Sequence, residues 1–241
     1  MKGRIVQAGV AALLIAVVLS GCDFVNSLIA QFAPKDEDIT LYQFEEVAPK
    51  NPEYVLLETT HGTIKILLLN EAVPNASKNF AGLAKENFYK DTFIYGVDHE
   101  SGALLAGCPE GDGTGSETFL DEPFDVELSL DTYCFTGAVG MLPDIDTDKN
   151  DCKFFIVAPQ TLTEEDMKNH KAFLAPKVYQ KYLEVGGNPE LDGFFSIFGQ
   201  VVEGMDVVEK IMTVELDDKN SPVVPIQFLS CEYIGPEEWK D

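Results

Sequence analysis

Residues 53–88, EYVLLETTHGTIKILLLNEAVPNASKNFAGLAKENF, carry the clearest signals for local structure in the chain. Two apolar runs flank the residues THGT, and this pattern predicts a β-hairpin in which Gly62 can take a positive φ. Pro74 suits the first turn of a helix, and Phe80 and Leu83 then share one helical face. We therefore expect an antiparallel hairpin followed by an amphipathic helix that covers the end of a sheet.

The rest of the chain alternates short apolar runs with glycine-rich or acidic turns. One further segment, GMDVVEKIM at residues 204–212, has the apolar spacing of a helix. Many short strands with two helices predict a mainly β fold, a closed antiparallel barrel of about eight strands capped by two helices. The later predicted strands are ALLAG (103–107), CFTGAVGML (134–142), CKFFIVA (152–158), FFSIFGQVV (194–202) and PIQFLSCEYIG (225–235).

A segment at about residues 160–188 does not fit this alternation of short strands and turns. It is helical in character, and Thr163 is a plausible N-cap. The segment is too long for a simple turn between two strands. We expect a helical insertion that lies over one face of the barrel.

The start of the chain has the pattern of a targeting segment. A short basic start, MKGR, precedes an apolar run that ends in LSGC, with the cysteine at position 22. LSGC resembles the lipobox of bacterial lipoproteins, which implies a signal peptide at residues 1–21 and lipidation of Cys22. An unprocessed signal anchor with an incidental cysteine is the alternative. We expect a lipid-anchored tether at residues 22–50, a folded domain at 51–236 on the extracytoplasmic face of the cell membrane, and a tail at 237–241.

The charge of the chain excludes one class of partner. Lys and Arg total 17 against 41 Asp and Glu, which gives a net charge of −24. Such a surface repels the phosphate backbone, so no nucleic-acid partner is expected.

Two patterns that often bind metals fail in this sequence. No CxxC or His/Cys cluster suggests zinc, and we expect the mature cysteines to be single buried thiols without a cofactor. The segment DIDTDKND, residues 144–151, begins like a calcium loop. Lys149 and Phe155 stand where that loop needs Gly and Glu, so a solvated acidic loop is expected and no metal site. The mature cysteines are Cys108, Cys134, Cys152 and Cys231.

The order of these signals from Glu53 to about Ile234 resembles the cyclophilins, a family of peptidyl-prolyl cis/trans isomerases. The opening hairpin and helix, the loop PEGDGTG (109–115) and the strand pair GAVGML…KFFIV match the family pattern in order. The segment ELDGFFSIFGQVVEGMDVVEKI (190–211) matches it near the end. The resemblance implies an eight-stranded closed barrel. The insertion looks like that of bacterial secreted or lipoprotein members of the family.

The family's catalytic side chain has no counterpart in this sequence. The resemblance implies an Arg that stabilises the twisted prolyl amide electrostatically, in the motif Phe-His-Arg-Val. The matching run here is Ile94-Tyr95-Gly96-Val97, so Gly96 stands at the position of the Arg. The only arginine in the chain is Arg4, within the predicted signal peptide. We therefore expect no catalytic residue to be retained.

The resemblance also implies a peptide-binding groove, most of whose positions differ here. Phe155 would form the floor of the proline pocket, although the barrel could keep it for packing alone. Lys153 stands in place of a Gln, and its point charge does not replace the planar fork of an Arg. The expected groove residues are Leu104, Leu105, Phe155, Glu190, Leu191 and Phe195.

Three functions fit these observations. The first is a weak isomerase that assists the folding of extracytoplasmic proteins by desolvating the prolyl amide. The second is a non-catalytic module that binds extended polypeptides, proline-containing or basic, at the membrane. The third is a scaffold whose old groove is filled by its own side chains, with the insertion or the acidic face as the true interaction surface. A groove closed by Phe195, Leu104 and Leu105 favours the third, and an open pocket over Phe155 favours the first two.

Overall fold

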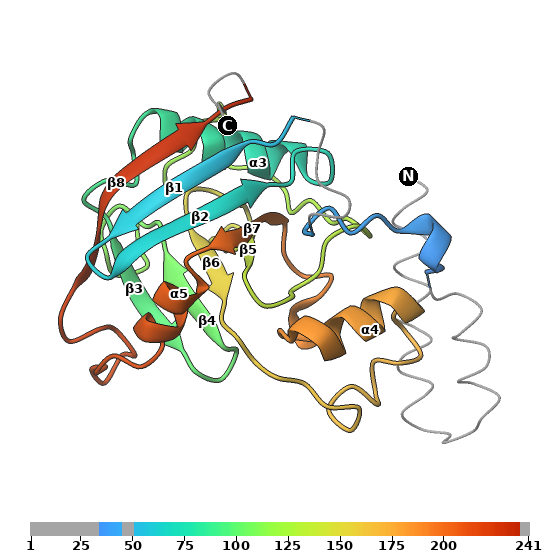
Figure 1. Cartoon of the computed structure of the whole chain (residues 1–241). Helices are drawn as coiled ribbons and strands as arrows, with labels where there is room; N and C mark the ends of the chain where they lie inside the picture. The colour runs from blue at the N-terminus through green and yellow to red at the C-terminus, as the bar shows by residue number, and fades with distance from the viewer. Residues whose placement is uncertain (1–33, 45–50, 237–241) are drawn as a thin grey trace.

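The computed structural model describes residues 34–44 and 51–236 of the 241-residue chain, and eight strands form a closed barrel in it (Figure 1). The strand order around the barrel is β1-β2-β7-β5-β6-β4-β3-β8, and every neighbouring pair is antiparallel. The predicted mainly β barrel is thus confirmed. The strands are β1 (Tyr54–Thr59), β2 (Gly62–Leu68), β3 (Phe93–Asp98), β4 (Ala103–Ala106), β5 (Ala138–Met141), β6 (Phe154–Val157), β7 (Ile197–Glu203) and β8 (Ile226–Ile234).

Two helices pack against the barrel, as the sequence predicts. Helix α3 (Pro74–Lys85) contacts β7 and β8, and helix α5 (Met205–Ile211) contacts β2. Pro74 occupies the first turn of α3, where its missing N–H costs no hydrogen bond. The buried face of α3 includes Phe80 and Leu83, which enter the barrel core.

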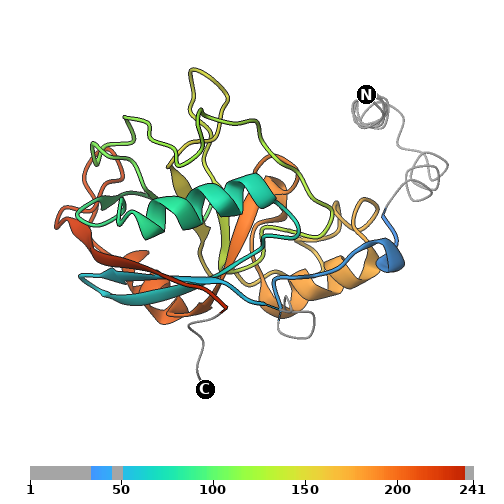
Figure 2. The same ribbon diagram turned by 90° about the horizontal axis from the view of Figure 1, so that it is seen from above.

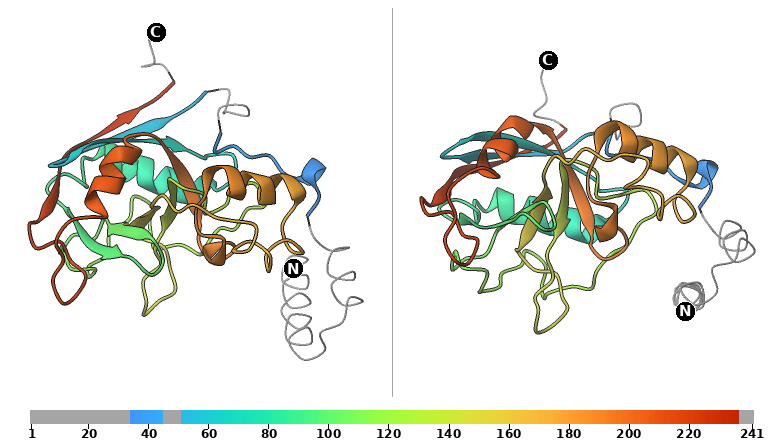
Figure 3. Two further views of the ribbon diagram at one scale, coloured as in Figure 1. Left: turned by 60° about the horizontal axis from the view of Figure 1, so that its bottom comes forward. Right: turned by 90° about the horizontal axis from the view of Figure 1, so that it is seen from below.

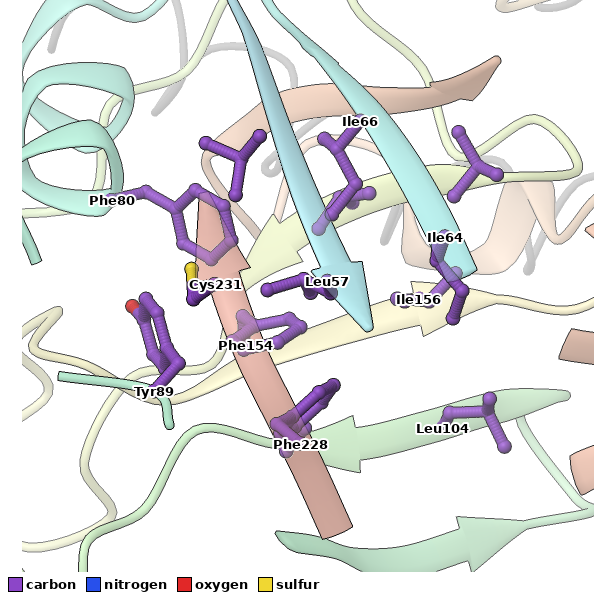
Figure 4. Packing of buried hydrophobic residues seen from close by; sticks show 14 of the residues in the cluster. Leu57, Ile64, Ile66, Phe80, Tyr89, Leu104, Phe154, Ile156, Phe228 and Cys231 are labelled. Carbon is purple, nitrogen blue, oxygen red and sulfur yellow. The ribbon is translucent and has the colours of Figure 1, made fainter. Parts of the chain in front are cut away.

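The barrel interior is filled by aliphatic and aromatic side chains (Figure 4). Phe80 of α3 meets Phe154 of β6 edge to face, with ring centroids 5.2 Å apart, and meets Phe198 of β7 at 4.6 Å. Leu104 of β4 and Ile156 of β6 point into the same interior. Such packing, with each side chain removed from water, supplies the main stabilisation of the fold.

The insertion is less regular than its sequence predicts. Its helix α4 spans only Pro176–Val185, and residues 164–173 form successive turns. Thr163 does not begin a regular helix, although its side chain and backbone N–H both donate to Asp166. Pro176 explains the start of α4, because a proline is favoured in the first turn and excluded from the interior of a helix.

Residues 34–44, which we call the N-terminal arm, pack along the insertion (Figure 3). Ile39 and Leu41 enter a second apolar cluster with Phe135, Tyr179 and Tyr182. Ile39 and Leu41, which lie within the expected tether at residues 22–50, therefore pack against the folded domain. The predicted signal peptide, Cys22 and the tail at 237–241 lie outside the described residues.

Gln43 fixes the end of the arm to the barrel. Its side-chain Nε2 donates to the Tyr133 carbonyl at 2.9 Å and to Oε1 of Gln200 at 2.8 Å. Its Oε1 accepts from the Tyr133 N–H at 2.8 Å. Gln43 is only 2% exposed, so these bonds satisfy polar groups that water does not reach.

Two observations concern the cysteines and the membrane. Within the described ranges, Cys108, Cys134, Cys152 and Cys231 are buried free thiols. Burial raises the pKa of Cys231 to about 12, so this thiol stays protonated and unreactive. Over residues 34–44 and 51–236, the structure contains no helix with the length and apolarity needed to cross a membrane.

Candidate functional site

The candidate site lies on the outer surface of the barrel, where alternate residues of β4, β5, β6 and β7 point away from the interior. Ten apolar side chains gather there, and we call them the outer cluster. The cluster is formed by strand residues and by three loops that fold over them, so it is built from distant parts of the chain. Its members are Ala103, Leu105, Cys134, Ala138, Leu142, Phe155, Val157, Leu191, Phe195 and Ile197.

Phe155 lies at the centre of the outer cluster and is covered. Its side chain is only 2% exposed. The ring of Phe195 stands edge to face against it, with centroids 5.0 Å apart and an interplanar angle of 72°. On its other side Phe155 fills the space above Gly140, where a Cβ would lie 2.4 Å from the ring. The expected floor of the proline pocket therefore has no open space above it in this structure.

The space beside Gly96, the position expected for an arginine, is also occupied, because the side chain of Leu105 lies against it. Gly96 lies opposite Leu105 across a local irregularity in the pairing of β3 with β4. A Cβ on residue 96 would come within 3.1 Å of Leu105 Cδ1. Residue 96 has no side chain, and the apolar side chain of Leu105 takes up the space that one would need. Next to them, burial raises the pKa of the Tyr95 phenol, which stays neutral.

Lys153 is the cation nearest to Phe155 in sequence, and the structure shows where it points. Its ammonium donates to Oδ2 of Asp151 at 2.5 Å, to the Gly115 carbonyl at 3.0 Å and to Asp144 at 3.4 Å. Burial alone would lower the pKa of Lys153, but the hydrogen bond and charge of Asp151 outweigh it and raise this pKa. The ammonium is therefore charged and fully engaged, and it is not free to reach a prolyl carbonyl.

The segment that carries Glu190, Leu191 and Phe195 is held by the insertion. Nε2 of His170 lies 3.1 Å from Oε1 of Glu190. The hydroxyl of Tyr182 in α4 donates to the carboxylate of Asp192 at 2.7 Å, and the Cys134 N–H donates to the same carboxylate at 2.8 Å. Burial raises the pKa of Asp192 to about 7, although these hydrogen bonds act in the opposite direction.

The structure brings most, but not all, of the predicted groove residues together. Leu105, Phe155, Leu191 and Phe195 meet in the outer cluster. Glu190 lies at the edge with its side chain 79% exposed. Leu104 is removed from the candidate groove, because it points into the barrel interior (Figure 4) and is only 1% exposed. Successive residues of a strand face opposite sides, so Leu104 and Leu105 could not both line one groove.

Sequence reasoning missed several residues of the site. Leu142 and Ile197 belong to the outer cluster, and Asp192 ties the covering segment to α4. Alternation along β7 indicates the outward direction of Ile197, but nothing local predicts the contact between Asp192 and Tyr182. That contact depends on how the insertion folds back.

The acidic loop is held by its own hydrogen bonds, and two surface hollows lie away from the outer cluster. Asp144 accepts from the backbone N–H groups of Asp146 and Thr147, which uses its carboxylate within the turn. In the described part of the chain, no group of three or more His, Cys, Asp or Glu side chains is arranged to hold a metal ion. The two best-formed hollows, of about 330 and 340 Å³, lie beside α3 and between the arm and the insertion, away from Phe155.

Comparisons with known proteins agree with this architecture. Residues 54–233 match the family model described as cyclophilin type peptidyl-prolyl cis-trans isomerase/CLD. A protein of Staphylococcus saprophyticus that carries the name of a peptidyl-prolyl cis-trans isomerase is 28% identical over 181 residues, which cover 75% of this chain and 91% of that protein. Peptidyl-prolyl cis-trans isomerase ppi1 of Schizosaccharomyces pombe is 27% identical over 73% of this chain and 96% of its own length. The crystal structure of a Cryptosporidium parvum cyclophilin-type isomerase superposes with a TM-score of 0.60 at 22% identity, over 76% of this chain and 98% of that chain, which supports the fold.

Proposed function

Because the chain belongs to the family of cyclophilin-type peptidyl-prolyl cis-trans isomerases, we propose that it binds extracytoplasmic polypeptides with little or no isomerase activity. The observation that carries this proposal is the covering of Phe155 by Phe195. A prolyl ring that entered the expected pocket would first have to displace that aromatic side chain. A filled groove is the mark of the third function weighed above, so we assign polypeptide binding to a surface other than the old groove.

The chemistry of isomerisation supports the same proposal. Rotation about the prolyl C–N bond meets a barrier of about 18–20 kcal/mol, and catalysis requires stabilisation of the twisted amide. An arginine could supply this by donating from a planar fork, but the chain has none after Arg4. Lys153 is held by two carboxylates and a carbonyl. The covered Phe155 and the engaged Lys153 both support a low isomerase activity.

We also propose that the protein is lipidated at Cys22 and acts on the outer side of a bacterial cell membrane. The basic start, the apolar run and the sequence LSGC at residues 19–22 support this. Ile39 packs in the second apolar cluster, and 16 residues separate it from Cys22 in the sequence. A Cys22→Ser variant should no longer be found in the membrane fraction, and it should not be labelled by a fatty-acid analogue. Retention of both would contradict the anchor.

A refolding experiment tests the function directly. A secreted client protein with a slow, proline-limited refolding phase is refolded with and without the full-length chain in detergent micelles; such phases take about 10–100 s without a catalyst. We expect the chain to reduce aggregation of the client and to leave the rate of the slow phase unchanged. An increase in that rate in proportion to the chain would show catalysis. No effect on aggregation would argue against polypeptide binding.

A further inference from the structure

Three loops meet beside the covered pocket, and their meeting point is the hydroxyl of Ser196. Ser196 is fully buried, and its Oγ accepts from the Glu127 N–H at 2.8 Å and lies 3.0 Å from Nδ2 of Asn150. The Met141 N–H donates to the Ser196 carbonyl at 3.0 Å. An ion pair at 2.5 Å between Lys149 and Asp125 joins the first two loops at the surface. The loops of residues 123–131, 142–150 and 193–196 therefore meet at Ser196.

Each of these loops exposes a large apolar side chain. Ile145 is 92% exposed, Phe194 is 67% exposed and Leu128 is 45% exposed. Phe194 directly precedes Phe195, and Ile145 follows the outer-cluster residue Leu142 by three positions. Large exposed apolar side chains near a packed cluster are typical of a protein-interaction surface. We call Leu128, Ile145 and Phe194 the apolar triplet.

Carboxylates are frequent in the sequence on either side of the apolar triplet. Between Asp91 and Asp148 the sequence contains 14 Asp and Glu residues and no Lys or Arg. The two cations that follow are engaged, Lys149 with Asp125 and Lys153 with Asp151. In Figure 2 the long loops of this part of the chain project from one side of the barrel. The carboxylates on and beside the three loops are Asp125, Glu127, Asp144, Asp146, Asp148 and Glu190.

We propose that the apolar triplet and its carboxylates bind extended polypeptide segments in which lysine or arginine alternates with apolar residues. This inference rests on the proposed function and names the chemistry of the partner. The apolar side chains of such a segment would cover Ile145 and Phe194, and its cations would face Asp146 and Asp148. Charge complementarity selects this partner, because an acidic protein, a nucleic acid or an anionic lipid surface would be repelled. The segment needs no proline, since the covered pocket takes no part.

A set of three proline-free peptides provides the test. The first is a short peptide in which lysines separate leucines, and in the other two every Lys is replaced by Gln or by Glu. Binding to the full-length chain in micelles is measured by fluorescence anisotropy at low and at high salt. We expect the Lys peptide to bind, with an affinity that falls as salt rises, and we expect the Glu peptide not to bind.

Matched variants locate the site. Asp146→Asn combined with Asp148→Asn removes two exposed charges, and Asn is tolerated at residue 148, where φ is 55°. We expect this pair to weaken binding of the Lys peptide by roughly three- to tenfold. Ile145→Ser should weaken it by a similar factor. Glu209→Gln combined with Glu232→Gln removes two charges on α5 and β8 and should change nothing.

Each remaining outcome overturns the inference. Equal binding of the Lys, Gln and Glu peptides, no binding of any of them, or full binding by the Asp146/Asp148 variant would do so. If the Gln peptide binds as well as the Lys peptide, polypeptide binding stands and the basic preference fails. If the chain does not suppress aggregation of the client in the refolding experiment, the proposed function itself fails.

Discussion

The ring of Phe195 covers the ring of Phe155, with centroids 5.0 Å apart and planes inclined at 72°. This contact covers Phe155, the residue expected to form the floor of a proline pocket. It joins a residue of β6 to a loop that the insertion holds through Tyr182 and Asp192. The closed pocket is thus a product of tertiary structure, formed by segments that are far apart in the sequence.

Replacing Phe195 should destabilise the protein and expose Phe155. Phe195→Ala removes a partly buried ring, and we expect a loss of about 2–4 kcal/mol in the free energy of unfolding. Phe194→Ala is the matched control, because Phe194 is 67% exposed and its removal should change that free energy by about 0.5 kcal/mol or less. Chemical denaturation measures both. Equal effects of the two variants would mean that Phe195 does not cover the pocket.

The two lysine ion pairs near the site should differ strongly in their importance. Lys153→Ala leaves the buried carboxylate of Asp151 without its partner and should cost about 3–5 kcal/mol in the free energy of unfolding. Lys149→Ala breaks an exposed pair with Asp125 and should cost about 0–1 kcal/mol. Urea denaturation of both variants at the same pH provides the comparison. A small effect of Lys153→Ala would contradict the buried position of its ammonium.

The N-terminal arm should contribute measurably to stability. Gln43→Ala removes three hydrogen bonds and leaves the Tyr133 backbone groups unsatisfied in a buried position. We expect a loss of about 1–3 kcal/mol in the free energy of unfolding. Gln180→Ala on the exposed face of α4 is the control and should have little effect. If both variants unfold at the parent midpoint, residues 34–44 behave as a tether after all.

Asp192 should make stability fall as pH rises. Its pKa is raised to about 7 in the folded chain by burial, against an ordinary value of 3.8. The folded state therefore binds more protons than the unfolded state between these values, and the stability contributed by the protonated carboxyl is lost as pH increases from about 4 to about 7. The stability of Asp192→Asn should be close to that of the parent at pH 4, and it should rise relative to the parent between pH 4 and pH 7. A difference that does not change with pH would rule out this titration.

Much of the fold could be predicted from the sequence because its signals are local. The alternation in residues 53–69 and the position of Pro74 indicate the hairpin and α3 directly. The N-terminal arm could not be predicted in this way, since Ile39 and Leu41 lack strand or helix periodicity and pack only because the insertion offers them an apolar surface.

In the candidate site, too, the local features could be predicted from the sequence and the tertiary contacts could not. The absence of an arginine is a fact of composition, and the outward direction of Phe155 follows from strand alternation. Applying that alternation to β4 would have separated Leu104 from Leu105. The covering of Phe155 could not be predicted, because it depends on a loop whose position is set by Tyr182 and Asp192 across the fold.

One measurement tests the central claim most directly, the cis/trans exchange rate of an Xaa-Pro peptide measured by NMR with and without the full-length chain. With Phe155 covered and Gly96 in place of an arginine, we expect the exchange rate to equal that of the peptide alone at every concentration of the chain. An exchange rate that rises in proportion to the chain would show that the closed pocket opens and that this fold catalyses isomerisation without an arginine.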